Sequence, residues 1–433
     1  MSGTMRPMRA RSWWWPWVLS ALLGCVHDSG GTVVELWAMG REGDIVVDLL
    51  PEFERRTPGV RVRVQQIPWS AAHEKLLTAY VGNTMPDLFQ VGNTWIPEFV
   101  ALGAIQPLDS RIAGSSTVRS DDYFPGILDT NVIDGRTFGI PWYVDTRLLF
   151  YRTDLLRRAG MAQPPTTWTA WVDVLTRIKT AAGPRAYAIL LPLNEWQPPV
   201  ILALQRGAAL LRDDDRYGNF RSREFLEAFE FYLGLFQRDL APRSGESQVG
   251  NLYQDFASGY FSQCITGPWN IGELARRLPA NVADSWGTAP LPAPHGDYPG
   301  ASVAGGASLA IFHGARHADA AWQLIEYLSE PAQQIAFYRL SGDLPARKTA
   351  WVEARLTEDQ YAAAFWIQLQ RLRAIPKIPE WERIADKITH YVEAAVRADL
   401  TAEAALTALD MDVDAILEKR RWMLQRGRAP SDS

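Results

Sequence analysis

The sequence has few cysteines, few histidines and no excess of positive charge, and these shortages narrow what the protein can be. Its 433 residues include two cysteines and six histidines, with 44 Lys and Arg against 49 Asp and Glu, for a net charge of −5. Nucleic-acid binding relies on clustered basic residues, so no nucleic-acid partner is expected. A disulfide framework is not expected either, because a chain of this size buries a large core without one.

Motifs of known enzymes and metal sites are also missing. The sequence contains no H-E-x-x-H, no G-x-S-x-G, no Walker A and no G-x-G-x-x-G after a strand. His313 and His317 are four residues apart, but Gly314 and Ala315 make a metal-binding helix there a poor prediction. Residues 213–215 are consecutive aspartates, which are typical of a solvated turn. The sequence therefore predicts a protein that is not an enzyme and holds no metal or cofactor.

Long hydrophobic runs are absent beyond the N-terminus. Residues 1–24 carry three arginines and no acidic residue around a short apolar run at 13–23, which is shorter than the roughly 20 residues of a membrane-spanning helix. This pattern predicts a signal peptide over 1–24. The ending LLGC at 22–25 resembles the lipobox of bacterial lipoproteins, which implies a lipid on Cys25 and a tether over 25–31. A plain cleaved signal with an incidental cysteine is the alternative.

Tryptophan is unusually abundant, with 18 residues in the chain. Four of them lie within the predicted signal peptide, so fourteen remain for the mature protein. Some of these are expected to fill the core, where tryptophan is usually largely buried. The others call for a different explanation, and a ligand site with aromatic walls is the candidate.

The first part of the mature chain alternates strands with helices. Residues 32–38 are rich in β-branched side chains, residues 60–65 alternate apolar with polar ones, and 86–91 form a third short strand; helical spacing covers 45–56 and 71–80. This alternation predicts parallel βαβ units in an open α/β sheet. Ligands bind beyond the carboxyl ends of such strands. The loops at those ends comprise residues 39–44, 67–70 and 92–95.

Two later segments have the character of connections between domains. Residues 137–151 form an unusually long extended run after the hairpin signal Asp134-Gly135. Residues 284–299 are rich in Pro and Gly. The tail, residues 391–424, has apolar positions at helical spacing.

The order of these elements resembles the extracellular solute-binding proteins of ABC sugar importers. Eight segments are similar to family positions in the same order, and the resemblance covers nearly all of 32–433. The segments are PEFERRTPGVRV at 51–62, MPDLF at 85–89, GAIQPLD at 103–109, DGRTFGIP through LLFYRTDLL at 134–156, PTTW at 165–168, GPWN at 267–270, APLP at 289–292 and GG at 305–306.

The resemblance implies an α/β, two-lobe periplasmic-binding-protein fold of type II, whose lobes are joined by crossing strands with the ligand cleft between them. The lobes then close on a solute by hinge motion. On this basis lobe 1 comprises 32–143 and 291–329, lobe 2 comprises 146–288 and 331–433, and the hinge lies near 144–145, 289–290 and 330. It further implies a monomer that is exported to the periplasm or cell surface, anchored to the membrane through Cys25, and that delivers its solute to the permease subunits of an ABC transporter.

A carbohydrate is the expected ligand, because sugars need aromatic plates for their C–H faces and planar polar groups for their hydroxyls. The run PWYVD at 141–145 resembles the maltose- and trehalose-binding branch, in which Tyr and Asp two residues apart contact the sugar; alternate strand residues share a face. Gly92 and Ala307 depart from that branch. The candidate ligand-binding residues are Glu42, Trp69, Asn93, Trp95, Trp142, Tyr143, Asp145, Trp269, Gly305, Gly306, Arg347 and Trp381.

Structural roles are the alternatives for these residues. Trp142 and Trp269 could fill an interlobe core, Glu42 could act at a helix N-terminus, and Arg347 could be a surface charge. At the level of function, a di- or oligosaccharide of the maltose or trehalose type is the expected solute. The alternatives are the same fold binding another sugar or glycerol phosphate, an exported glycoside hydrolase with carboxylates from distant segments, and a structural surface lipoprotein.

Overall fold

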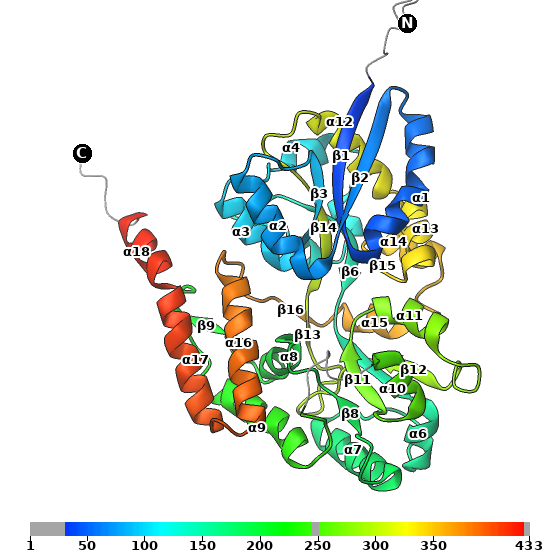
Figure 1. Cartoon of the computed structure of the whole chain (residues 1–433), viewed down its shortest axis with the longest axis vertical. Helices are drawn as coiled ribbons and strands as arrows, with labels where there is room; N and C mark the ends of the chain where they lie inside the picture. The colour runs from blue at the N-terminus through cyan, green and yellow to red at the C-terminus, as the bar shows by residue number, and fades with distance from the viewer. Residues whose placement is uncertain (1–30, 244–250, 428–433) are drawn as a thin grey trace, which may run out of the picture.

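The computed structural model describes residues 31–243 and 251–427 (Figure 1). The predicted signal peptide and the lipidation site at Cys25 lie outside these ranges. Within them, no helix combines the length and the apolar character needed to cross a membrane. The two larger sheets of the described residues, of six and four strands, lie one at the top and one at the bottom of Figure 1, and we call the units around them lobe 1 and lobe 2.

The sheet of lobe 1 has six strands and gathers segments from three parts of the chain. β1 pairs in parallel with β2 and β3, whereas β14 runs antiparallel to both β3 and β6. Residues of β2 alternate between half-buried and exposed along most of the strand, as the sequence predicts. Across the sheet the strands are β15 (Leu344–Pro345), β6 (Ile140–Asp145), β14 (Gly305–Ile311), β3 (Leu88–Gly92), β1 (Thr32–Met39) and β2 (Val60–Ile67).

Amphipathic helices cover this sheet. Ile45, Leu49 and Phe53 of α1 repeat every four residues and are buried in the core against β1 and the helix α13. The helices of lobe 1 are α1 (Gly40–Arg56), α2 (Trp69–Val81), η1 (Asn93–Trp95), α3 (Ile96–Ala101), α4 (Asp109–Gly114), η2 (Ser120–Asp122), α5 (Pro125–Asp129), α12 (Ala318–Leu328), α13 (Pro331–Ser341) and α14 (Lys348–Glu353). A small hairpin joins β4 (Val132–Ile133) to β5 (Arg136–Thr137), at the predicted Asp134-Gly135 turn.

The sheet of lobe 2 has four strands, in the order β12 (Trp286–Ala289), β7 (Leu148–Arg152), β11 (Gln263–Thr266) and β8 (Ile189–Leu190). The C-terminal helices α16 and α17 pack on each other and on α9, along the left of Figure 1. The helices of this lobe are α6 (Thr153–Arg158), α7 (Trp168–Ala182), α8 (Gln197–Gln205), α9 (Arg223–Gln237), α10 (Leu252–Ser258), α11 (Trp269–Arg277), α15 (Ala363–Gln368), α16 (Trp381–Val396), α17 (Ala402–Ile416) and α18 (Glu418–Gly427). A hairpin pairs β9 (Leu211–Arg212) with β10 (Tyr217–Gly218).

Two of the segments that cross between the lobes lie side by side. The long extended run of the sequence divides into β6 in lobe 1 and β7 in lobe 2, with Thr146 and Arg147 between them. The return segment contains β13 (Ser302–Val303), which pairs with β16 (Leu372–Arg373). The Thr146 hydroxyl donates to the Val303 carbonyl at 2.9 Å, and the Ser302 hydroxyl donates to the Arg147 carbonyl at 2.8 Å.

The second crossing lies later in the chain than the predicted 289–290. Residues 290–301 stay with lobe 2, because the backbone of Ala293 bonds to Thr166 and Trp168 at the start of α7. The passage to lobe 1 comes at Ala304, between β13 and β14. The Pro- and Gly-rich composition correctly marked an irregular segment, but composition does not say which lobe an irregular segment packs against.

The third crossing is also displaced from its predicted place near residue 330. That position joins α12 to α13, and both helices pack on lobe 1: α12 contacts β14, and α13 contacts α1 and β15. The chain passes to lobe 2 only between α14, which contacts α13, and α15, which contacts β7 and β12. Residues 331–353 therefore belong to lobe 1. Pro331 marks the start of a helix, as proline often does, and not a change of lobe.

Candidate ligand-binding cleft

A cavity of about 600 Å³ lies between the lobes, and both contribute its walls. Lobe 1 supplies the predicted loops at the carboxyl ends of β1, β2 and β3, together with the end of β6 and the start of β14. Lobe 2 supplies the starts of α8, α10 and α16 and one face of α11. Helix starts and strand ends therefore converge on one space, as the open-sheet rule predicts.

The loop after β1 brings Glu42 into the cavity wall. Gly40 has a φ of +52°, and a Cβ there would lie 2.7 Å from the Trp69 ring, so glycine is needed for Glu42 and Trp69 to approach. The Trp69 indole donates to Glu42 Oε1 at 3.2 Å. Glu42 also lies in the first turn of α1, where the helix dipole favours a negative charge.

A hydrogen-bond chain from the sheet holds Tyr143 against Glu42. The Met39 backbone N–H donates to Gln90 Oε1 at 2.7 Å, and the Gln90 amide donates to the Tyr143 hydroxyl at 3.0 Å. That hydroxyl donates to Glu42 Oε1 at 2.7 Å. Asp145, two residues further along β6, also lines the cavity. The spacing of Tyr143 and Asp145 thus places both on the cleft side of the strand.

The loop after β3 carries Asn93 and Trp95. Asn93 Oδ1 accepts from the Ser308 hydroxyl at 2.8 Å, which ties this loop to β14. The ring of Trp95 lies 5.8 Å from that of Trp69 in an edge-on arrangement, so the two form one aromatic corner. Gly305 and Gly306 line the cavity beside them. A Cβ on Gly306, whose φ is +120°, would lie only 2.4 Å from the Tyr143 carbonyl.

Lobe 2 faces this corner with aromatic and charged groups. The Trp269 ring folds back over Gly267, where a Cβ would lie 1.9 Å from the indole, so this ring position requires glycine at 267. The Arg147 guanidinium lies 4.5 Å from the centre of the Trp269 ring. Glu273 and Arg277 follow Trp269 at four-residue intervals, which places all three on one face of α11.

A family model for bacterial extracellular solute-binding proteins matches residues 40–335. This chain belongs to the bacterial extracellular solute-binding protein family. The structure matches that of the sugar-binding protein MalE from Xanthomonas citri with a TM-score of 0.86 and 48% sequence identity, over 91% of this chain and 99% of that one. These findings confirm the predicted family and the two-lobe α/β fold. The family makes the chain an exported solute-binding protein and not an enzyme.

Two further relatives bear names with different solutes. The diacetylchitobiose binding protein DasA of Streptomyces coelicolor is 25% identical over 384 residues, covering 87% of this chain and 88% of its own. The sn-glycerol-3-phosphate-binding periplasmic protein UgpB of Agrobacterium fabrum is 23% identical over 340 residues, covering 74% of this chain and 76% of its own. Membership of the family therefore does not by itself fix the solute.

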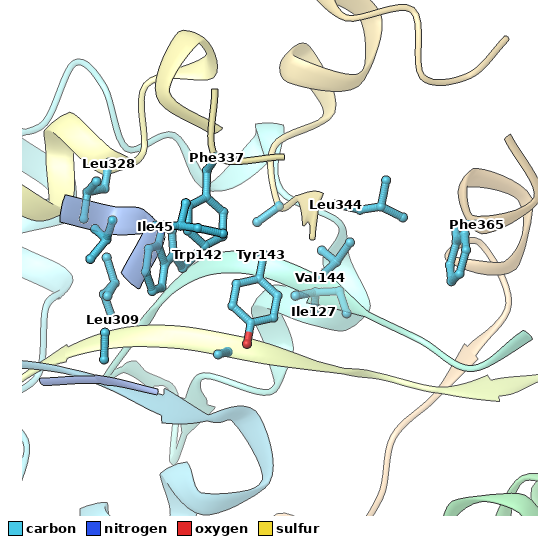
Figure 2. Close-up of a cluster of buried hydrophobic side chains, with 14 of the residues drawn as sticks. Ile45, Ile127, Trp142, Tyr143, Val144, Leu309, Leu328, Phe337, Leu344 and Phe365 are labelled. Atoms are coloured by element: carbon cyan, nitrogen blue, oxygen red, sulfur yellow. The ribbon is translucent and has the colours of Figure 1, made fainter. Parts of the chain in front are cut away.

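Three residues predicted to contact ligand lie away from the cavity of this solute-binding protein. Trp142 is 2% exposed and packs against Phe337 with ring centres 4.5 Å apart; Figure 2 shows it beside Phe337 and Ile45. On β6 it points to the face opposite Asp145, because strand side chains alternate. Trp381 is fully buried, and its ring packs edge-on behind Trp196.

Arg347 is the third predicted ligand residue that lies away from the cavity, and its side chain hydrogen-bonds to residues of lobe 1. Its guanidinium donates to Asp122 Oδ2 at 2.7 Å and to the carbonyls of Thr117 and Ser329 at 2.7 and 2.9 Å. The residue is 6% exposed. These three acceptors hold the side chain inside lobe 1, where it links the α12–α13 junction to the segment before α5. The sequence showed an arginine after Pro345 but not the carboxylate that holds it.

Several side chains that line the cleft were not predicted. They are Arg41, Thr94, Thr146, Arg147, Trp196, Gln197, Tyr253, Glu273, Arg277, Ser341, Asp343 and Glu382. The helical spacing after Trp269 could have identified Glu273 and Arg277. Glu382 follows the predicted Trp381 by one residue, an error of one position on a helix start. For Asp343 and Trp196, no local pattern in the sequence marks a cleft position.

Carboxylates dominate the charge of the lobe 1 wall. Burial raises the pKa of Glu42, although the hydrogen bond from Tyr143 opposes the shift. Burial, followed by repulsion from Glu42, raises the pKa of Asp343 well above its ordinary value. Burial also raises the pKa of Asp145, with Arg147 opposing it. Raised pKa values favour the neutral carboxyl, which both donates and accepts, so this wall suits partners such as hydroxyl groups that also do both.

Some polar atoms in the cleft are left without a protein partner. Asp145 Oδ1, Arg147 Nη1 and Gln197 Oε1 are buried and make no hydrogen bond within the described part of the chain. Buried polar groups are normally paired, so these atoms mark positions for a ligand's polar groups. Among residues 31–243 and 251–427, no cluster of His, Cys, Asp and Glu has the arrangement of a metal site.

Proposed function

We propose that this protein is the substrate-binding component of an ABC importer, and that it captures a di- or oligosaccharide of the maltose or trehalose type between its lobes and delivers it to the membrane permease. The observation that carries this proposal is the pairing of aromatic walls with a carboxylate-rich wall in one cavity. The aromatic walls are Trp69, Trp95, Trp196, Tyr253 and Trp269. Such surfaces suit the apolar C–H faces of sugar rings.

The size of the cavity supports a ligand of more than one ring. A hexose displaces about six waters, or roughly 180 Å³ at about 30 Å³ per water. The cavity of about 600 Å³ then holds two or three rings. Because the aromatic residues of the cavity come from both lobes, successive sugar rings can contact different aromatic side chains while the lobes close on the ligand.

The charges favour a neutral solute over a phosphate. Three arginines line the cavity, but each already has protein acceptors nearby: Arg41 donates to the Leu340 carbonyl, Arg277 pairs with Glu273 at 2.5 Å, and Arg147 lies 4.0 Å from Glu195. Glu42, Asp145 and Asp343 face the same space. An anion would meet three acidic side chains here, whereas a sugar hydroxyl can hydrogen-bond to a carboxyl group in either protonation state. Glycerol phosphate is therefore the less favoured solute.

A thermal-shift screen tests this proposal. Maltose, trehalose, other disaccharides, monosaccharides and glycerol 3-phosphate are added over a range of concentrations, and the melting temperature and tryptophan fluorescence are followed. We expect a saturable shift with a disaccharide, because a ligand that binds only the folded state stabilises it. A shift with glycerol 3-phosphate alone would overturn the sugar assignment. Release of monosaccharide product would identify a hydrolase instead.

We also propose that Cys25 carries the lipid that anchors the mature protein. The LLGC ending of the N-terminal segment supports this assignment. Replacing Cys25 with Ser should move the protein from the membrane fraction to the soluble exported fraction without changing its sugar affinity. Equal membrane association of both forms would contradict the anchor.

A further inference from the structure

The two lobes touch at one rim of the cleft through a pair of glycines. Gly272 lies in α11 of lobe 2, and Gly342 follows α13 of lobe 1; α11 lies at the edge of lobe 2 that faces lobe 1 (Figure 1). A Cβ on Gly272 would lie 3.1 Å from the Ser341 carbonyl oxygen and 3.5 Å from the Gly342 Cα. A Cβ on Gly342 would lie 3.1 Å from the Gly272 nitrogen. The two backbones therefore meet so closely that a Cβ at either position requires one of them to shift by a few tenths of an ångström.

Local structure explains Gly342 but not Gly272. Gly342 has a φ of +89° and ends α13, with its N–H donating to the Tyr338 carbonyl at 2.8 Å, which is a usual place for glycine. Gly272 lies inside α11, where glycine destabilises a helix relative to alanine. The close approach of the other lobe supplies the reason for glycine at this position. The remaining near atom, Arg276 Nη1 at 3.2 Å, is the end of a flexible side chain that can move.

The contact lies next to two groups that face the cavity from opposite lobes. Trp269 begins α11, three residues before Gly272, and Asp343 directly follows Gly342. Both Trp269 and Asp343 line the cleft. Because each is joined to its glycine by a short, ordered piece of backbone, the distance between the glycines sets the distance between the indole and the carboxylate.

We propose that Gly272 and Gly342 are positioning residues, whose contact sets how far the lobes close and so the gap between Trp269 and Asp343 in which the ligand is held. This inference rests on the proposed function, since that gap is where the sugar binds. Binding sites must hold their groups within about 0.5 Å of the productive geometry. A methyl group at 272 requires the rim to open by a few tenths of an ångström, and a larger side chain requires more.

The test compares Gly272→Ala and Gly272→Leu with a matched control, Gly234→Ala. Gly234 also lies inside a helix, α9, but a Cβ there has no neighbour within 4 Å, and it does not line the cleft. Both alanine variants gain helix propensity, so neither should melt below the wild type without ligand. We expect the affinity for the disaccharide that binds best, maltose or trehalose, to fall about tenfold in Gly272→Ala and at least about a hundredfold in Gly272→Leu. Gly234→Ala should bind as the wild type does.

A merely structural role for Gly272 would predict a more stable Gly272→Ala variant with unchanged affinity, and that result would overturn the proposal. Small-angle X-ray scattering at saturating sugar supplies a second measurement: the radius of gyration should shrink in the wild type but stay larger in Gly272→Leu. If the wild type binds neither sugar, the proposed function fails, and scattering alone then tests the rim contact. A larger radius of gyration in Gly272→Leu than in wild type and Gly234→Ala supports it, and equal values overturn it.

Discussion

Asp343 is an example of a residue whose burial costs stability. It is 5% exposed and lines the cavity with Glu42. Burial, followed by repulsion from the Glu42 carboxylate, raises the pKa of Asp343 well above the ordinary value of 3.8. The folded protein therefore keeps a proton that the unfolded chain releases above about pH 4. By linkage, the free energy of unfolding falls as the pH rises from there through the raised pKa.

We expect Asp343→Asn to raise the free energy of unfolding at neutral pH by roughly 1 kcal/mol, because the amide carries no charge. The gain should shrink toward pH 4, where Asp343 is protonated and resembles the amide. Sugar affinity should change little where Asp343 is protonated, since the amide, like the neutral carboxyl, both donates and accepts hydrogen bonds. Denaturant titrations between pH 4 and 8 measure the first effect. A gain that is constant over this range would contradict the raised pKa.

Trp142 and Trp269 are both tryptophans of the predicted site, and the structure gives them different roles. Trp269→Ala should weaken sugar binding at least tenfold with little loss of stability, because its ring faces the cavity. Trp142→Ala should lower the free energy of unfolding by about 3–5 kcal/mol, because it empties a core position. Asp145→Ala should behave like the Trp269 variant. If neither Trp269→Ala nor Asp145→Ala changes binding, the ligand lies elsewhere.

Arg347 provides a test of a buried ion pair. Arg347→Met removes the partner of Asp122 in a setting where the two side chains are 7% and 12% exposed. Breaking such a pair should cost about 3 kcal/mol of stability, measured by denaturant unfolding, while the folded variant keeps its sugar affinity. Arg55→Met, at an exposed pair with Glu52, serves as the control and should change stability by less than about 1 kcal/mol. If Arg347→Met is stable but loses sugar affinity, the structural role is contradicted and Arg347 acts in ligand binding.

At the scale of elements, the start of α16 bridges the cleft on the side of η1. Glu382 of lobe 2 lines the cavity together with Thr94 and Trp95 of lobe 1, and α16 contacts η1 there; burial raises the pKa of Glu382. His73, Glu98 and the Trp95 ring lie on the lobe 1 side of this contact, where His73 Nε2 is 2.6 Å from Glu98 Oε2. The first turn of one helix thus connects the two lobes.

We expect Glu382→Ala to reduce sugar affinity and to enlarge the radius of gyration at saturating sugar, because one interlobe contact is lost. Glu382→Gln keeps the size of the side chain and an acceptor oxygen at this contact, and it should retain most of the affinity. Isothermal titration calorimetry and small-angle scattering on the same samples measure both effects. Equal losses in the two variants would show that the charge, and not the bridge, matters.

At the scale of the whole molecule, ligand binding and stability are linked through the lobes. The cleft residues come from both lobes, so only the folded, assembled chain presents the site. A ligand at 100 times its Kd should then stabilise the fold by about 2.7 kcal/mol. Melting curves at increasing sugar concentration measure this, with Trp269→Ala as a control that needs more sugar for the same shift. A single lobe that shifts alone would contradict a site shared between lobes.

The sequence alone determined what depends on local order. Alternating β-branched strands and amphipathic helices predicted the α/β sheet, the strand ends predicted the cleft loops, and the spacing of Tyr143 and Asp145 predicted a shared face. The motif order predicted the family. These features follow from the hydrophobic periodicity of each segment and from the direction of its strands, and both are local properties of the chain.

Only the tertiary structure decided which side chains reach the cleft and where the chain changes lobe. Trp142, Trp381 and Arg347 have the chemistry of ligand contacts, but packing against Phe337, Trp196 and Asp122 places them elsewhere. Gly272 meets Gly342, seventy positions away, at the rim, and Asp343 lies near Glu42, about three hundred positions away. Such contacts depend on how distant segments pack, and no local pattern encodes that. The abundance of tryptophan likewise indicated both core and ligand-site positions. Only the packing of each ring shows which tryptophans fill the core and which line the cleft.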